Sequence, residues 1–142
     1  MNTTSAAAAG AVTFVWLGMV LAISFLEAPL KFRAPGVTVP LGLGIGRLVF
    51  RALNSVEAVL AVAVIVAVAV GDPTAWIVAS TVVVTASLAG QLTVIRPRLN
   101  RRSDRVLAGE ELPRSRGHLA YVAVESVKVV ALLTLGVSLL AV

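Results

Sequence analysis

The chain has 142 residues, of which 58% are hydrophobic and 13% charged, and it contains no cysteine. Soluble domains usually carry about a quarter charged residues, so this composition indicates a protein whose solvent is lipid. Without cysteine, disulfides, thiolate metal sites, iron–sulfur clusters and thiol nucleophiles are excluded. The net charge of +5 does not indicate nucleic acid binding, because the cations flank apolar segments and no basic face with interleaved aromatic residues is evident.

Four apolar segments follow one another, each close to the roughly 20 residues that a membrane-spanning helix needs. They cover residues 6–27, 43–70, 74–95 and 118–141. No positive charge precedes the first segment, and its length suits a full span, so we expect a retained helix and not a secretory signal. The pattern predicts a single transmembrane domain over residues 1–142, with no separate soluble domain.

Prolines and glycines set the predicted ends of these helices. Pro29 and Pro35 are expected to break the first helix. The sequence Gly71–Asp72–Pro73–Thr74 predicts a tight hairpin in which Asp72 caps the third helix and Pro73 lies in its first turn. Pro97 and the polar residues after it are expected to end the third helix.

All the lysines and arginines except Lys128 belong to two of the connections between the apolar segments, and the amino terminus, the Gly71 hairpin and the end of the fourth segment carry none. The positive-inside rule places such connections in the cytoplasm. One connection carries Lys31, Arg33, Arg47 and Arg51, and the other carries Arg96, Arg98, Arg101, Arg102, Arg105, Arg114 and Arg116. The sequence therefore predicts a multi-pass protein of the cell membrane with both termini and the Gly71 hairpin outside. The fold class is all-α, an up-and-down membrane four-helix bundle.

Ionisable and polar residues recur on the second and fourth segments at helical spacing, so that each set lies along one face. The second segment carries Arg47, Arg51, Asn54 and Glu57, and the fourth carries His118, Tyr121, Glu125 and Lys128. At about 1.5 Å per residue, Glu57 lies roughly 15 Å beyond Arg47, and Lys128 lies equally far beyond His118. If the two faces meet, Glu57 pairs with Lys128 and Arg51 pairs with Glu125. Exchanging Glu57 and Lys128 should then be tolerated better than either single reversal.

Two interpretations of these buried charges stay open. They could lock the bundle in register without any chemistry. Alternatively, they could form a polar cavity on the cytoplasmic half that handles a small solute or a proton. Glu27, Gln91 and Arg96 end the first and third segments on the same side and could complete the mouth of this cavity, although Glu27 could simply sit at the interface beside Lys31.

His118 is the single histidine, and it precedes Tyr121 by one helical turn. One imidazole could ligate haem iron or carry a proton, so a membrane oxidoreductase with His118 or Tyr121 near a cofactor is the alternative function. Residues at the end of a span are more often interfacial, and Tyr121 equally fits an aromatic belt. Trp76 is expected to anchor that belt, and Trp16 to pack within the membrane.

The two basic connections favour contact with lipid. Residues 28–47 are unusually apolar for a loop, so we expect them to lie along the cytoplasmic interface, with Lys31 and Arg33 reaching anionic lipid head groups. The alternating glycines before Arg47 lack the rest of a phosphate loop and are better explained by close packing or by a flexible entry to the second span. The arginine-rich connection determines topology or docks acidic lipid or a cytoplasmic partner.

Short motifs resemble a broad group of small four-span membrane proteins of unassigned function. They are Ser24–Phe25–Leu26–Glu27–Ala28–Pro29–Leu30–Lys31–Phe32, then Gly46–Arg47–Leu48–Val49–Phe50, and Arg116–Gly117–His118 before the last span. The resemblance covers the whole length as architecture and implies the four-span fold. It implies no catalytic residues, and Glu27, Glu125 and Lys128 depart from the commoner apolar pattern.

Together these features predict a non-enzymatic membrane protein that handles a small solute or proton, or acts as an accessory subunit of a larger membrane complex. The candidate binding residues are Glu27, Arg51, Asn54, Glu57, His118, Tyr121, Glu125 and Lys128. We expect no metal and no cofactor, because too few candidate ligands are present. A single narrow bundle would need a homo-oligomer to form a pore.

Overall fold

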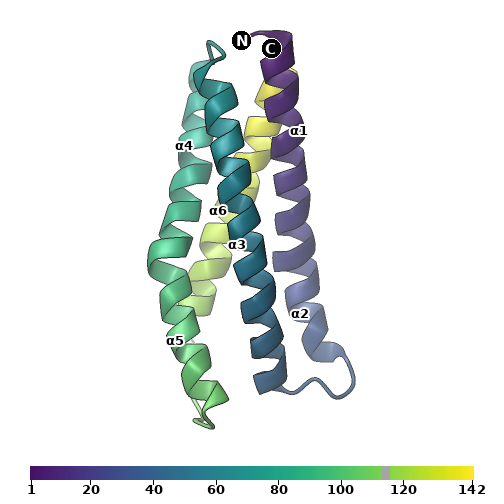
Figure 1. Ribbon diagram of the computed structural model, residues 1–142, viewed down its shortest axis with the longest axis vertical. Helices are drawn as coiled ribbons and strands as arrows, with labels where there is room; N and C mark the ends of the chain where they lie inside the picture. Colours follow the sequence, from purple (N-terminus) through teal and green to yellow (C-terminus); the bar gives the residue numbers. More distant parts are fainter. Residues whose placement is uncertain (113–115) are drawn as a thin grey trace.

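The computed structural model describes residues 1–112 and 116–142. In these residues the regular structure is helical throughout, and it forms four long segments that run antiparallel (Figure 1). They are Thr3–Arg33, Val39–Ala69, Ala75–Leu107 and Arg116–Leu140. Each is long and apolar enough to cross a membrane, by length and composition. The all-α, four-helix prediction is confirmed at this level.

Two of the long segments are not uniform α-helices. The first segment consists of α1 (Thr3–Val20), the π-helical η1 (Leu21–Glu27), α2 (Ala28–Leu30) and the 3₁₀ turn η2 (Lys31–Arg33). The second is α3 (Val39–Ala69) and the fourth is α6 (Arg116–Leu140). The third consists of α4 (Ala75–Gly90), the π-helical η3 (Gln91–Ile95) and α5 (Arg96–Leu107).

Pro29 and Pro97 do not end the first and third segments, so this part of the sequence prediction is wrong, whereas the first segment does end at Arg33, shortly before Pro35. Each π-helical stretch stands directly before an X-Pro pair, Ala28–Pro29 or Arg96–Pro97. The Ala28 N–H donates to the Ile23 carbonyl, and the Arg96 N–H donates to the Gln91 carbonyl, five residues back in both cases. This widened turn adapts the backbone hydrogen bonds of the helix to a proline, which has no N–H. The helix therefore continues beyond the proline. The third segment therefore reaches Leu107.

The starts of the second and third segments also differ from the prediction. α3 begins at Val39, ahead of the expected residue 43, because the Thr38 side chain accepts a hydrogen bond from the Leu41 N–H and caps the helix. α4 begins at Ala75 with Thr74 at its N-cap position. Asp72 is therefore not the cap, and Pro73 precedes the helix instead of lying in its first turn.

The early start of α3 turns the glycine-rich stretch into helix and gives two of its glycines a packing role. A Cβ at Gly42 would overlap the ring of Phe32, and one at Gly46 would lie 3.0 Å from Lys31 Nζ. Much of the connection expected along the interface is therefore the first turns of α3, packed against η2. Close packing is the role that the sequence predicted for these glycines.

Both chain ends lie beside the α3–α4 hairpin (Figure 1). The opposite end carries the connection from η2 to α3 and the end of α5, and we call it the basic end. An ion pair between Arg47 and Asp104 joins α3 to α5 there. The described residues of the two basic connections thus lie at one end of the bundle, because successive long segments run in opposite directions, and Arg114 lies outside the described residues.

The half of the bundle near the termini is filled by apolar side chains. Its core includes Val64, Ile77, Val84, Leu132 and Leu135, each at most 2% exposed. α1 packs against α3 and α6, and α4 packs against α6. The outer faces are also apolar: Val62 and Val130 are more than 60% exposed, and Trp76 is 72% exposed. Polar residues gather instead in the middle of the bundle and toward the basic end.

Candidate functional site

Three charged side chains are buried together in the middle of the bundle. Lys128 on α6 is fully buried, and its Nζ lies 2.5 Å from Glu57 Oε1 and 2.6 Å from Glu125 Oε1. Glu57 comes from α3, whereas Glu125 precedes Lys128 by one turn on α6. Neither carboxylate is more than 1% exposed. One ammonium group therefore holds two carboxylates.

Neutral side chains from the other helices complete the hydrogen bonding. Trp16 Nε1 on α1 donates to Glu57 Oε1 at 2.9 Å, and Ser24 Oγ on η1 donates to Glu125 Oε2 at 2.8 Å. The Gln91 amide accepts from Lys128 Nζ at 2.8 Å and donates to Glu125 Oε1 at 3.3 Å. All four long segments thus contribute to what we call the buried network, namely Trp16, Ser24, Glu57, Gln91, Glu125 and Lys128.

The two π-helical stretches supply two members of this network. Ser24 lies within η1, and Gln91 is the first residue of η3. A π-helical turn rotates the side chains that follow it relative to an ideal α-helix, and such turns are frequent at functional sites. The same local irregularity therefore accommodates Pro29 and Pro97 and lies where polar groups face the two carboxylates.

The network carries one more negative than positive formal charge. Buried charges need partners, because the packed interior of the bundle offers them no solvation by water. Oε1 of Glu57 accepts from both Lys128 and Trp16, but its buried Oε2 has no hydrogen-bond partner among the described residues. If the network binds one further proton or monovalent cation, its formal charge becomes zero.

The structure contains one of the two predicted charge pairs. Glu57 meets Lys128 as predicted from their equal depth. The Arg51–Glu125 pair is wrong, because Lys128 reaches Glu125 along its own helix and Arg51 is exposed on a different face of α3. The depth of a residue along a helix follows from its residue number. The direction in which Arg51 points depends instead on the rotation of α3 about its own axis, which the neighbouring helices determine. Asn54 is buried at 7% exposure, and its Oδ1 has no partner among the described residues.

A cavity of about 440 Å³ extends from the basic end to this network. Ser24, Tyr121 and Glu125 lie toward the middle of the bundle, and Lys31 and His118 lie nearer the basic end. Phe25, Phe32, Phe50, Leu99 and Val122 contribute apolar wall. The volume falls within the range of ordinary small-molecule sites, roughly 300–1,000 Å³.

An arginine and two aromatic rings form one wall of the cavity. The Arg96 guanidinium carbon lies 4.5 Å from the ring centre of Phe50 and 4.6 Å from that of Tyr121. The two rings meet edge to face at 5.6 Å. Tyr121 is 5% exposed, so it does not belong to an interfacial belt. Arg96 attracts the faces of both rings and holds them in place.

Of the other residues expected at the mouth of the cavity or near a cofactor, Glu27 and His118 lie apart from the network. Glu27 is half-buried and pairs with Lys31 at 3.7 Å, and it does not line the cavity. His118 is exposed and lines the cavity near the basic end. Gln91, expected at the mouth, lies deeper and belongs to the network. Among the described residues, no three histidine or carboxylate side chains come together as a metal site would require.

Two network residues were absent from the predicted site. Trp16 was expected only to pack, although a buried indole N–H needs an acceptor, and that need was the available signal. Ser24 carried no comparable signal, because a serine inside a helix can also bond its own backbone.

Comparison of the chain with protein-family models, curated proteins and solved structures found no match.

Proposed function

We propose that this is an integral membrane protein whose basic end lies in the cytoplasm. The apolar outer faces of four helices, and the absence of lysine and arginine from both termini and from the α3–α4 hairpin, support this orientation. Both termini and the α3–α4 hairpin then face outward. The buried network lies near the middle of the bilayer, and the cavity opens toward the cytoplasm.

In this orientation the cavity handles a small solute or a proton from the cytoplasmic side. One observation carries the proposal: Glu125 belongs both to the cavity wall and to the buried network. A group that enters the cavity therefore reaches a carboxylate that is linked through Lys128 to Glu57. Ionisable groups stacked inside a membrane bundle commonly mark ion or proton paths.

Beyond Glu57 the described interior of the bundle contains no charged side chain, and its polar side chains are Thr13, Ser80 and Thr81, of which the two threonine hydroxyls donate to carbonyls of their own helices. Val64, Val84, Leu132 and Leu135 fill it, each at most 2% exposed. A single molecule in this conformation therefore gives access from one side only. Passage across the membrane needs either a rearrangement of these helices or a path formed between copies of the chain.

Proton flux into liposomes that contain the purified full-length chain tests the proposal. We expect flux with the unaltered chain, its loss in Glu125→Gln, and its retention in Glu110→Gln, which removes an exposed carboxylate at the basic end. The same vesicles are scanned with common small ions. Equal flux in all three proteins would exclude Glu125 from the path. Absence of flux from every folded variant would refute transport and favour an accessory role within a membrane complex.

A membrane oxidoreductase is the second candidate, because His118 and Tyr121 line the same cavity. One imidazole at the cavity wall provides a single ligand to haem iron. Purification in mild detergent, with haem offered and then removed from solution, tests this function. A visible absorption band that His118→Ala abolishes would support it, and a colourless protein would refute it.

A further inference from the structure

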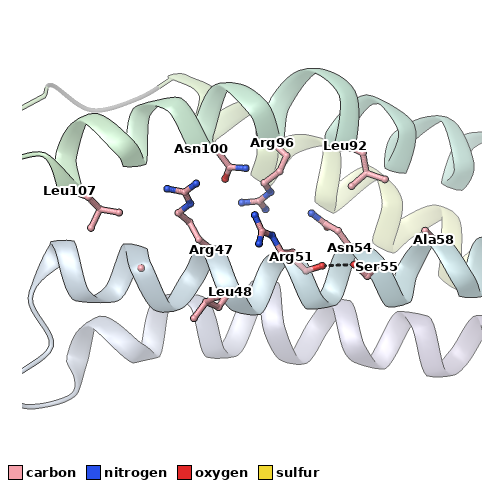
Figure 2. A pocket seen from close by; sticks show the side chains of 11 residues that line it. Arg47, Leu48, Arg51, Asn54, Ser55, Ala58, Leu92, Arg96, Asn100 and Leu107 are labelled. Carbon is pink, nitrogen blue, oxygen red and sulfur yellow. Dashed lines mark hydrogen bonds between the residues drawn. The ribbon is translucent and has the colours of Figure 1, made fainter.

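A second hollow lies on the side of the bundle, between α3 and the segment formed by η3 and α5 (Figure 2). Its volume is about 670 Å³. We call it the lateral groove, and it is lined by Gly44, Arg47, Leu48, Arg51, Asn54, Ser55, Ala58, Leu92, Arg96, Asn100 and Leu107. Arg51, Asn54 and Ala58 line this groove and not the interior cavity, so the two sites are separable by mutation.

Three arginines converge on the lateral groove. Figure 2 shows the side chains of Arg47, Arg51 and Arg96 turned into the space between α3 and the helix opposite. The lining residues, all within the described part of the chain, include no acidic side chain. Arg47 is paired with Asp104, which lies outside the lining. The groove is therefore electropositive through Arg51 and Arg96, which have no ion-pair partner among the described residues.

The hydrogen-bonding capacity of Arg51 and Arg96 is largely unused. Arg96 has two buried nitrogens, Nε and Nη2, without a hydrogen-bond partner among the described residues, although two aromatic rings fix its position. The Arg51 guanidinium group forms no ion pair and no hydrogen bond with any described residue. Guanidinium groups present several N–H donors in a planar fork that matches phosphate oxygens. The groove thus offers donors to an anion.

A buried acceptor lies beside these donors. Asn54 is 7% exposed and lines the groove, and its Oδ1 has no partner among the described residues. Buried polar atoms are normally satisfied, so this amide oxygen lacks a donor that a hydroxyl or N–H group of a ligand would supply once the amide turns toward the groove. The ligand that matches the groove therefore combines an anion with a hydrogen-bond donor.

We propose that the lateral groove binds the head group of an anionic phospholipid, with Arg51 and Arg96 holding the phosphate and Asn54 accepting from a head-group hydroxyl. The groove leads from these arginines past Ala58 and Leu92, toward the apolar half of the bundle. Val59 and Val62 continue the apolar outer face of α3 beyond it. Basic pockets between membrane helices on the cytoplasmic side are a known form of lipid recognition.

Binding of a short-chain lipid to the detergent-solubilised full-length chain tests the proposal. The probe is a water-soluble phosphatidylglycerol, compared with phosphatidylcholine of the same chain length by native mass spectrometry. We expect the phosphatidylglycerol to be preferred, and Arg51→Gln to weaken its binding about tenfold or more, because a charge-assisted hydrogen bond to phosphate is lost. Arg98→Gln is the matched control, since it removes the same charge from α5 outside the groove lining.

Three results would overturn the proposal. Equal weakening by Arg51→Gln and Arg98→Gln would mean that the lipid responds only to net charge. Displacement of the lipid by inorganic phosphate at comparable concentration would mean that the groove takes a free anion. Equal binding of phosphatidylcholine would remove the role of anionic charge.

A second variant separates binding from folding. Arg51→Lys keeps the charge at an exposed position and loses the planar fork. We expect it to retain the helical circular dichroism spectrum and to bind with intermediate affinity. Binding equal to that of the unaltered chain would contradict recognition by the fork. Proton flux tests Glu125, which lies outside the groove, so either proposal can fail without the other.

Discussion

Replacing Lys128 with methionine removes the cation of the buried network and keeps a side chain of similar length. Glu57 and Glu125 then remain buried, and both lose the ammonium group that lies within 2.6 Å of them. Removing one partner of a buried ion pair typically destabilises a protein by about 3–5 kcal/mol. Because two carboxylates lose the same partner here, we expect a loss in the upper half of that range.

Neutralising one of the two carboxylates should lower the free energy of unfolding only slightly. In Glu57→Gln the amide oxygen can still accept from Trp16 and Lys128, and Lys128 keeps Glu125 as its counter-ion. The network then holds one positive and one negative charge. We expect Glu57→Gln to cost about 1 kcal/mol or less, the net contribution of an ordinary hydrogen bond. This asymmetry follows from the excess carboxylate.

The same geometry changes the expectation for a charge exchange. From sequence alone, exchanging Glu57 and Lys128 should be tolerated. In the structure, a glutamate at position 128 faces Glu125, which lies 2.6 Å from the present ammonium group. We therefore expect the exchange to be about as harmful as Lys128→Met, and the further change Glu125→Gln to restore much of the stability by removing the repulsion.

Unfolding of the full-length chain in mixed micelles, driven by increasing sodium dodecyl sulfate, measures these differences. Tryptophan fluorescence in a Trp76→Phe background reports on Trp16, which is 1% exposed and contacts Glu57. Leu133→Met, at an exposed apolar position, is the control for a methionine on α6. Equal losses in Lys128→Met and Glu57→Gln, or a greater loss in Glu57→Gln, would refute the reasoning from charge balance.

Three further predictions concern other parts of the molecule. Trp16→Phe should destabilise the chain by about 1–3 kcal/mol in the same unfolding assay, because Glu57 loses a buried donor, and an unchanged midpoint would contradict this. In this cysteine-free chain, Asp72→Cys should react with a membrane-impermeant maleimide in intact cells and Ala108→Cys only after permeabilisation, whereas the opposite pattern would invert the proposed orientation. Gly136→Leu should lower the thermal midpoint, since a Cβ there would lie 2.7 Å from the nearest aromatic ring atom, and an unaltered midpoint would exclude this tight contact.

The local features of this fold follow from the sequence. Four apolar segments of membrane-spanning length predict four helices, because a backbone in lipid must satisfy its hydrogen bonds within each segment. Two residues at equal depth on two helices running in the same direction predict that Glu57 can meet Lys128, because the rise per residue is constant. These statements need only the position of a residue along its own helix.

The rotation and irregularity of each helix were decided by tertiary structure. Arg51 lines the lateral groove instead of meeting Glu125, since the face that α3 presents to α6 depends on how both helices pack against their neighbours. Pro97 continues the third segment because a π-helical turn precedes it. That turn lies where Gln91 can bond both Lys128 and Glu125, groups on another helix. Periodicity within one segment contains no information about such partners, so only the assembled bundle determines which polar groups meet.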